Sequence, residues 1–305
     1  MTYKAYNQIH PAIQFLIFAG IFIGILVIGN VIGAGIVLVL YGMKTLMAIA
    51  SLNVSTPHFL SAIWILQLTG TTFPILAAPV FFAFVIVKDP DDYIKPAFHF
   101  PWVLLLLILA IMFVSNPAIE FLSNLNQKMV LPPFLKWMRD SEDNAQKLTE
   151  AMLQMTTIWE MILDLLLIGL LTAMVEEFMF RGCLQTIFLR WTGNIHAAVW
   201  ITAILFSAFH MEFFGFLPRL LLGALFGYFV AWSGSVWTGV WAHFINNGTA
   251  VIATYLFKQK LIKVNPDDQH VFNYQGYVFS FIIILFLLFI YKRISIIKKR
   301  QIPES

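Results

Sequence analysis

The sequence has little charge. Asp, Glu, Lys and Arg make up 11% of its residues, whereas soluble domains contain about 25%. Hydrophobic residues account for 60% of the chain and form long apolar runs. This combination excludes an ordinary soluble domain and is typical of a polytopic α-helical membrane protein. The formal net charge of +3 is also too small to indicate a nucleic-acid partner, so we expect membrane lipid around the chain and no nucleic acid.

The sequence contains a single cysteine and lacks two common hydrolase motifs. The single cysteine, Cys183, cannot form a disulfide within the chain, and no base is spaced around it as in a cysteine enzyme. We therefore expect it to pack between helices. There is no HExxH sequence, the helix of many zinc proteases, and no GxSxG sequence to mark a serine nucleophile. Any hydrolytic site must be built from other residues.

The apolar runs predict an all-α membrane protein. A helix needs about 20 apolar residues to cross a bilayer, and the chain contains about eight such segments. The first is too long for a cleavable signal peptide and lacks a small-residue cleavage site, so we expect it to stay as a membrane helix. No repeat or low-complexity tract divides the sequence, and we expect residues 1–305 to form one integral membrane domain. The expected spans are residues 13–40, 58–87, 100–122, 156–180, 197–209, 216–232, 236–257 and 271–291.

Charged residues outside these segments bear on the topology. A group of cations follows the last apolar segment, and the positive-inside rule then predicts a cytoplasmic C-terminus. We expect the membrane to be a bacterial inner (plasma) membrane. The longest polar stretch, Asn124 to Glu150, predicts a short interfacial helix that serves as a solvated connector, with a gate over the site as the alternative. The C-terminal cations are Lys292, Arg293, Lys298, Lys299 and Arg300.

Three ionisable residues lie inside the apolar sequence VEEFMFRG. Charged groups at membrane depth are costly and usually line a protein interior or a water-filled cavity. Glu177 and Arg181 are four residues apart, so they share one helix face and can neutralise each other. Glu176 then has no partner nearby in the sequence, and a carboxylate in apolar surroundings suits a general base. The alternative is that both glutamates are solvated and inert in the headgroup region.

Two further pairs of residues, each with at least one polar member, lie in neighbouring apolar segments. His210 follows Phe206 by one helical turn, and Asn247 follows His243 by one turn. Imidazole and amide groups both carry N–H donors, so His243 and Asn247 can converge on one point as an oxyanion hole. The alternatives are a buried packing histidine and a hydrogen bond between helices. Together with a carboxylate base, one imidazole that orients water and a donor pair for the oxyanion suffice for hydrolysis of an amide.

The three patterns together resemble those of a known family. EExxxR, FxxxH and HxxxN on successive apolar segments are similar to the motifs of the CAAX prenyl protease and bacteriocin-processing family of intramembrane endopeptidases, also called the abortive-infection family. The expected residue type fills every motif position. The resemblance covers residues 156–257, whereas the first 150 residues match only as generic membrane helices.

The resemblance implies a fold and a set of roles. The fold is a bundle of about eight transmembrane helices around a polar, water-filled catalytic cavity, with residues 156–257 as the catalytic helices. Glu176 is the base, and His210 holds the water with it. His243 and Asn247 are the oxyanion donors. The supporting residues are Glu177, Arg181 and Phe206.

The same residues leave the metal question open. Glu176, His210 and His243 can form a zinc set with an open position for water. Asn247 is a poor zinc ligand, and three ligands on three separate helices show no local spacing pattern. We therefore expect that no cofactor is required, with zinc as the alternative.

The sequence thus predicts an intramembrane endopeptidase that uses a glutamate-activated water on a membrane-associated protein or peptide, lipidated or apolar. A non-enzymatic bacteriocin-immunity or scaffold protein of the same fold is the alternative, although such a protein is expected to lose a motif residue and none is missing. A transporter is disfavoured because the polar motif residues all lie in the second half. Arg219 is expected to anchor at the membrane interface or to guide a substrate carboxylate, and Gly223 with Gly227 predicts close helix packing.

Overall fold

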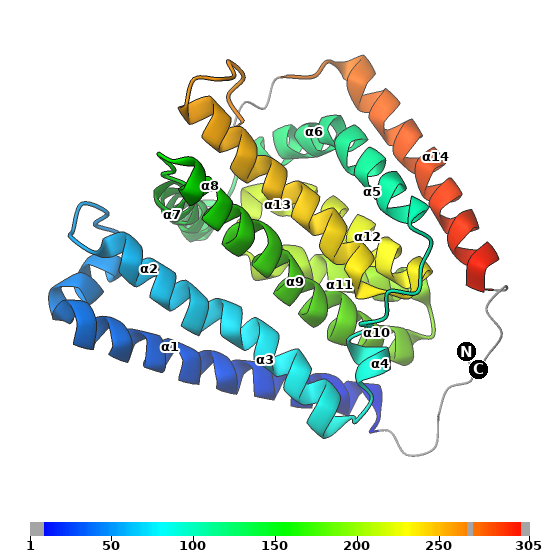
Figure 1. The fold of residues 1–305 in the computed structure, drawn as a ribbon, viewed down its shortest axis with the longest axis horizontal. Coiled ribbons are helices and arrows are strands. Elements are labelled where there is room, and N and C mark those ends of the chain that lie inside the picture. The colour runs from blue at the N-terminus through cyan, green and yellow to red at the C-terminus, as the bar shows by residue number, and fades with distance from the viewer. Residues whose placement is uncertain (1–8, 267–270, 300–305) are drawn as a thin grey trace. The chain divides into compact units, whose positions relative to one another are not determined.

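The computed structural model describes residues 9–266 and 271–299. The regular elements in those ranges are all helices, several of them long and apolar (Figure 1). An α-helix satisfies its backbone hydrogen bonds within itself, as the apolar interior of a membrane requires. The prediction of an all-α polytopic membrane protein is therefore confirmed.

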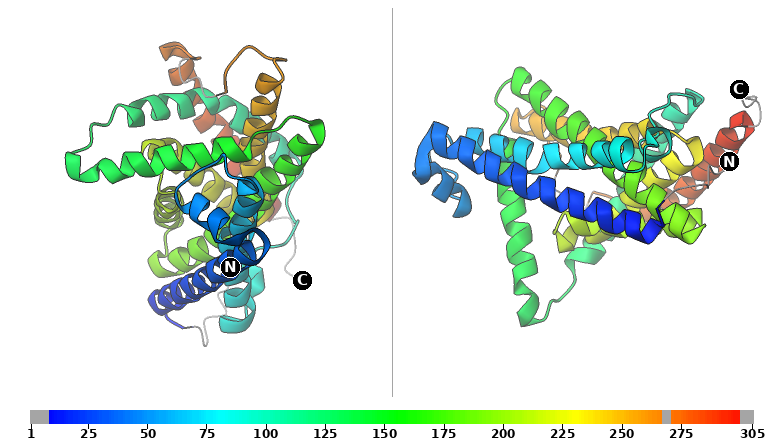
Figure 2. Two further views of the ribbon diagram at one scale, coloured as in Figure 1. Left: turned by 90° about the vertical axis from the view of Figure 1, so that its left-hand side faces the viewer. Right: turned by 90° about the horizontal axis from the view of Figure 1, so that it is seen from below.

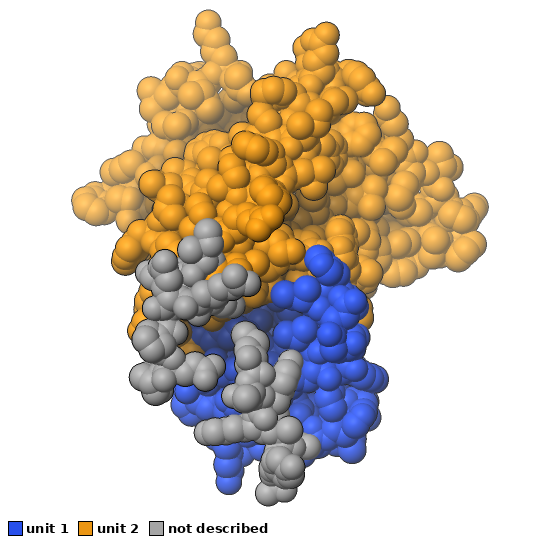
Figure 3. All heavy atoms as spheres, turned by 90° about the vertical axis from the view of Figure 1, so that its right-hand side faces the viewer, with its two compact units in different colours: residues 1–95, 175–198 blue, residues 96–174, 199–305 orange. Residues whose placement is uncertain are grey.

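The chain folds into two compact units, which Figure 3 colours separately. Unit 1 contains the described residues up to 95 together with residues 175–198. Unit 2 contains residues 96–174 and the described residues from 199 onward. Helices α9 (Thr172–Glu177) and α11 (Ile195–Phe209) each pass from one unit into the other. Both units therefore carry motif residues, and the expectation of a single domain stays a prediction.

Unit 1 is built on two long helical runs that lie against each other. Its elements are α1 (Pro11–Ala50), α2 (Phe59–Gln67), the π-helical η1 (Leu68–Thr72), α3 (Phe73–Phe81), the π-helical η2 (Phe82–Ile86), α4 (Pro90–Tyr93), the π-helical η5 (Phe178–Leu184) and α10 (Gln185–Thr192). The side chain of His10 caps the N-terminus of α1. The two runs approach closely because Gly29 and Gly33 lack side chains, and a Cβ atom at either position would overlap Thr69.

Unit 2 is a helical bundle with an apolar core between α5, α12, α13 and α14. Its elements are α5 (Val103–Val114), α6 (Asn116–Gln127), the 3-10 turn η3 (Pro133–Leu135), α7 (Lys136–Met152), α8 (Ile158–Asp164), the π-helical η4 (Leu165–Leu171), the 3-10 turn η6 (Phe213–Gly215), α12 (Phe216–Ser233), α13 (Val236–Lys258) and α14 (Tyr274–Lys299). In the core, the buried hydroxyl of Tyr291 donates to the carbonyl of Phe229 at 3.1 Å. Helix α13 also packs closely on η4, where Gly169 and Gly248 leave room for neighbouring side chains.

Fewer helices than predicted are long and apolar enough to cross a membrane. Five described runs meet that test, and the pair α5–α6, bent by 42°, brings the number to six. The test thus passes fewer helices than the expected count of about eight, for two physical reasons. Helix α11 has only 15 residues, and α13 has 23 but includes polar motif residues that lower its hydropathy. The five runs are Pro11–Ala50, Phe59–Ile86, Ile158–Thr192, Phe213–Ser233 and Tyr274–Ile296.

The polar stretch from Asn124 to Glu150 is helical for most of its length. It comprises the end of α6, the turn η3 and most of the 17-residue helix α7, which has no buried residue. In both views of Figure 2, the start of α7 projects from the other helices of unit 2. The location of this helix at a membrane surface stays a prediction. The cytoplasmic placement of the C-terminal cations does too, and Arg300 lies outside the described residues.

Candidate active site

Unit 1 carries the acidic motif at the junction of α9 and η5. The Glu177 carboxylate and the Arg181 guanidinium form an ion pair, with 2.7 Å between Oε1 and Nη1, and both side chains are 0% exposed. The pair therefore lies where the four-residue spacing places it, although its role in catalysis stays a prediction. Glu176 is also buried, with 8% of its surface exposed. The alternative in which both glutamates are solvated at a helix end is wrong for this structure.

The segment before α5 packs against the helix that carries the acidic motif. Gly182 follows the buried arginine, and a Cβ atom at this position would lie 2.6 Å from the Tyr93 carbonyl oxygen. One turn later, the Thr186 hydroxyl donates to the Asp92 carbonyl oxygen at 3.1 Å and accepts a hydrogen bond from the Lys95 ammonium. Burial lowers the pKa of this ammonium to about 8, against the opposing effect of Asp92. The close approach at Gly182 fixes how this segment docks on the motif helix.

Arg190 extends the same contact to the end of α10. Its guanidinium donates to the Asp89 carboxylate at 3.2 Å and to the Asp92 carboxylate at 2.8 Å, and it lies over the Tyr93 ring, 4.6 Å from the centroid. The Tyr93 hydroxyl in turn donates to the Gln14 side chain on α1. Sequence reasoning missed this docking, for which the signal was an acidic turn and a basic helix end separated by about a hundred residues.

The lone cysteine has the predicted structural role. Cys183 is fully buried in η5, and its sulfur lies 3.7 Å from the Pro79 carbonyl oxygen on α3. A buried thiol in apolar surroundings is a packing group and is poorly placed to react.

Unit 2 places both motif histidines against one phenylalanine. Phe206 lies on α11, is 3% exposed, and has its ring centroid 5.0 Å from the ring of His210 and 5.8 Å from that of His243. Helix α12 leaves room for this ring at Gly223, where a Cβ atom would lie 3.1 Å from Phe206 Cδ1. The close packing predicted at Gly223 is therefore present, and it positions an aromatic side chain between the two imidazoles.

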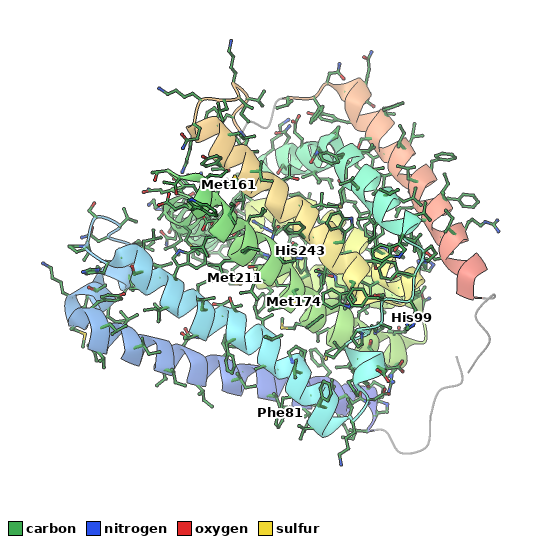
Figure 4. The ribbon with its side chains drawn as sticks, in the orientation of Figure 1. Phe81, His99, Met161, Met174, Met211 and His243 are labelled. Atoms are coloured by element: carbon green, nitrogen blue, oxygen red, sulfur yellow. The ribbon has the colours of Figure 1, made fainter. Side chains whose placement is uncertain are left out.

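The two imidazoles have different surroundings. His210 is half-buried just beyond the end of α11, and its Nδ1 lies 2.9 Å from the Phe206 carbonyl oxygen. Since a carbonyl only accepts, Nδ1 carries the proton and Nε2 of the neutral ring is an acceptor. His243 on α13 (Figure 4) is 4% exposed and stacks on Phe226, with 5.0 Å between ring centroids. One imidazole can accept from water, and the other is fixed by aromatic packing.

The amide of the third motif is oriented by two neighbours. Asn247 Nδ2 donates to the carbonyl oxygen of Ile168 in η4 at 3.3 Å. Its Oδ1 accepts from Asn246 Nδ2 at 3.1 Å. An asparagine amide carries two N–H donors, so one remains for a substrate oxyanion. Sequence reasoning missed Asn246, although two adjacent asparagines in an apolar segment are a signal.

A cleft of about 1120 Å³ opens in unit 2 beside the turn that follows His210. Arg219 faces this cleft and pairs with the Glu212 carboxylate, and it also donates to the Glu212 carbonyl oxygen at 3.0 Å. Asn246 lines the cleft too, next to the motif amide. Arg219 therefore stabilises the turn, while its predicted roles as an interfacial anchor or a guide for a substrate carboxylate stay predictions.

The structure brings the predicted residues together in two groups. Unit 1 holds the three residues of the acidic motif, and unit 2 joins Phe206 with both histidines and places Asn247 one turn farther along α13. No three His, Cys, Asp or Glu side chains in the described ranges are grouped closely enough to hold a metal ion. The need for a cofactor, and the alternative zinc set of Glu176, His210 and His243, stay predictions because these residues lie in two separate units.

Comparison with known proteins gives the same family as the motifs. The family model described as "Type II CAAX prenyl endopeptidase Rce1-like" matches residues 158–249, which include every motif residue. A Bacillus subtilis (strain 168) protein, "Uncharacterized protein YpbD", is 28% identical over 111 residues, which are 35% of this chain and 52% of that protein. The chain thus spans about half the length of this curated relative. No solved structure matches the chain. As the motifs predicted, the motif-bearing part of this membrane protein is similar to the Rce1-like family of type II CAAX prenyl endopeptidases.

Proposed function

We propose that this protein is an intramembrane endopeptidase that hydrolyses a peptide bond in a membrane-associated protein or peptide. The observation that carries the proposal is the match of residues 158–249 to a family of prenyl endopeptidases, because this segment contains all three motifs intact. The buried Glu177–Arg181 pair supports it, since a protein interior keeps charged groups only when they are paired or functional.

In the proposed reaction, Glu176 takes a proton from a water molecule while the water oxygen attacks the scissile carbonyl carbon. His210 holds this water through Nε2, because Nδ1 donates to the Phe206 carbonyl oxygen. As negative charge develops on the carbonyl oxygen, N–H groups of His243 and Asn247 donate hydrogen bonds to it. The proton on Glu176 then passes to the nitrogen as the C–N bond breaks. The joint action of these residues rests on the family motifs.

The Glu177–Arg181 pair has a supporting role in this proposal. Glu177 neutralises the arginine within the same helix, which leaves the neighbouring carboxylate of Glu176 as the base. Phe206 supports the other half of the site because its ring contacts both imidazoles. None of these three residues exchanges a proton with the substrate, so all three act by positioning.

The substrate class follows from the family and from the apolar helices that carry the motifs. We propose a lipidated or apolar protein or peptide, with bacteriocin-like peptides and membrane-protein maturation as the biological setting in a bacterial inner membrane. The cleft beside the turn after His210 is large enough for several residues of a peptide. The proposal requires no cofactor and no nucleic acid.

The test compares newly formed protein N-termini in membranes from three strains. A deletion strain is complemented with the natural protein, with Glu176→Gln or with Asp143→Asn, at matched protein levels. Asp143 is exposed on α7, so its variant matches the change from carboxylate to amide away from the site. We expect a set of N-termini with the natural protein and Asp143→Asn that is absent with Glu176→Gln. Identical profiles from all three folded proteins would contradict the proposal and favour a non-enzymatic immunity or scaffold protein.

A further inference from the structure

The stretch between α6 and the first turn of α7 exposes an apolar tip. Val130 is 94% exposed, Phe134 76% and Trp137 49%. Large apolar side chains that lie together in the open mark an interaction surface. Two consecutive prolines, the second of which begins the turn η3, lead into the projecting start of α7 (Figure 2).

The same stretch carries charge of one sign. Residues 128–139 contain Lys128, Lys136 and Arg139 and no acidic residue, whereas acidic side chains begin at Asp140. Cations around exposed aromatic and aliphatic side chains are the composition of segments that lie in the headgroup region of anionic bilayers. A protein partner would have to match the apolar tip in shape, whereas a lipid surface needs only apolar depth and negative charge.

The position of the stretch in the chain favours the same partner. It begins directly after Gln127, the last residue of the bent pair α5–α6, which together are long and apolar enough to cross a membrane. A residue that follows a spanning helix leaves the hydrocarbon region at the headgroup level. The apolar tip is therefore carried to the depth at which lipid can cover it.

We propose that residues 128–139 dock on the anionic headgroup surface of the bilayer, with Val130, Phe134 and Trp137 entering the boundary with the acyl chains. Lys128 and Lys136 contact lipid phosphates. The inference is independent of the proposed peptidase activity, because it concerns where this segment lies and not what the motifs catalyse.

The docked segment also contacts the turn that follows His210. The Trp137 ring packs edge-on against Phe213, with 5.2 Å between centroids. The Arg139 guanidinium lies 3.2 Å from the centroid of the Phe214 ring. A lipid surface that restrains this segment therefore also restrains the turn Met211–Gly215, through Trp137 and Arg139.

One turn farther along α7, two polar contacts fix the same turn. The Ser141 hydroxyl donates to the Met211 carbonyl oxygen at 3.3 Å, and Glu142 accepts from the Phe214 amide at 2.6 Å. A lipid surface that holds the start of α7 thus restrains the turn next to a motif histidine.

The test measures the depth of a probe at the tip. An environment-sensitive fluorophore is attached to Val130→Cys, or to Asn144→Cys on an exposed part of α7 as the matched control. Cys183 is buried, so labelled protein without an added cysteine supplies the background. The full chain is reconstituted in phosphatidylcholine vesicles with or without phosphatidylglycerol, and quenching is compared between spin-labelled lipid and aqueous iodide.

We expect the probe at position 130 to be quenched by lipid in the vesicles that contain phosphatidylglycerol, several-fold more than at position 144. Lys128→Gln with Lys136→Gln should reduce this difference, as should high salt. Iodide quenching at 130 equal to that at 144 would overturn the proposal, and so would equal lipid quenching without the anionic lipid. Burial that persists in detergent and rises with protein concentration would identify a second copy of the chain instead and would also overturn it.

Discussion

The two units hold their motif residues by opposite means. Unit 1 keeps a full charge pair, Glu177 and Arg181, with no exposed surface. Unit 2 packs His243 against two phenylalanine rings. An ion pair in an apolar interior fails severely when one partner is removed, because the other charge remains buried. Aromatic packing fails more gradually, since each ring contributes a modest contact energy. Substitutions in the acidic motif should therefore reduce the stability of the protein most, whereas substitutions around the histidines should mainly disturb the geometry of the site.

The largest expected effect tests the charge pair. Arg181→Met leaves the Glu177 carboxylate buried without its cation, and we expect it to reduce the free energy of unfolding by about 3–5 kcal/mol. The double variant Glu177→Met with Arg181→Met removes both charges and should recover much of that loss. Cys183 is buried and is the single cysteine, so its reaction with a thiol-reactive dye on heating in detergent reports unfolding. A double variant as unstable as the single one would contradict this account.

The second prediction tests the aromatic arrangement. Phe206→Leu nearly conserves volume, so we expect a stability loss below about 1.5 kcal/mol. It removes the ring that contacts both imidazoles, however, and a small misplacement of reacting groups costs about a hundredfold in rate. We expect the N-termini that depend on Glu176 to fall far more than stability does. Phe279→Leu, at a residue that is 65% exposed on α14, is the control and should change neither quantity.

The third prediction sharpens the comparison through the segment that holds the acidic motif. The pKa of Lys95 is lowered to about 8 by burial, against an ordinary value near 10.4. Between these values the unfolded chain binds more protons than the folded one, so stability should rise as pH increases from about 8 toward 10. Lys95→Met should remove this rise. The measurement is the unfolding temperature of both proteins across that range, and parallel curves would contradict it.

The smallest expected effect concerns the residue beside the third motif. Asn246→Ala removes the hydrogen bond to Asn247 Oδ1, which should cost about 0.5–1.5 kcal/mol. The Asn247 amide then keeps only its hydrogen bond to the Ile168 carbonyl oxygen and is less firmly oriented, so the proposed peptidase activity should fall without a large change in stability. Asn246→Asp should not restore activity, because an ionised carboxylate cannot donate to that oxygen. Activity equal to that of the natural protein in both variants would remove Asn246 from the site.

Local spacing predicted the local contacts of the site. Residues four apart on a helix share a face, and this periodicity is enough to predict the Glu177–Arg181 pair. It is also enough to bring Phe206 and His210 together. Hydropathy predicted an all-helical membrane protein because apolar length is a property of the sequence itself.

Contacts between distant segments could not be read in this way. The fit of the Tyr93 carbonyl against Gly182 depends on how two segments approach, and glycine at one position does not say what fills the space. The hydropathy test passes fewer spans than expected for a related reason. Asn246, Asn247 and His243 make α13 too polar for the hydropathy test although its length is sufficient, and the sequence does not state which helices lipid surrounds.

The π-helical segments on both sides of α9 have a consequence for the evolution of this chain. A π-helix is commonly a single-residue insertion that an α-helix has absorbed, and such segments occur often at functional sites. One residue corresponds to about 100° of rotation in an α-helix. A substitution that made η4 α-helical without removing a residue would therefore turn every side chain after it, Glu176 included, by about that angle relative to the preceding turns. Homologous chains should accordingly keep these π-helical turns, or lose one only together with one residue.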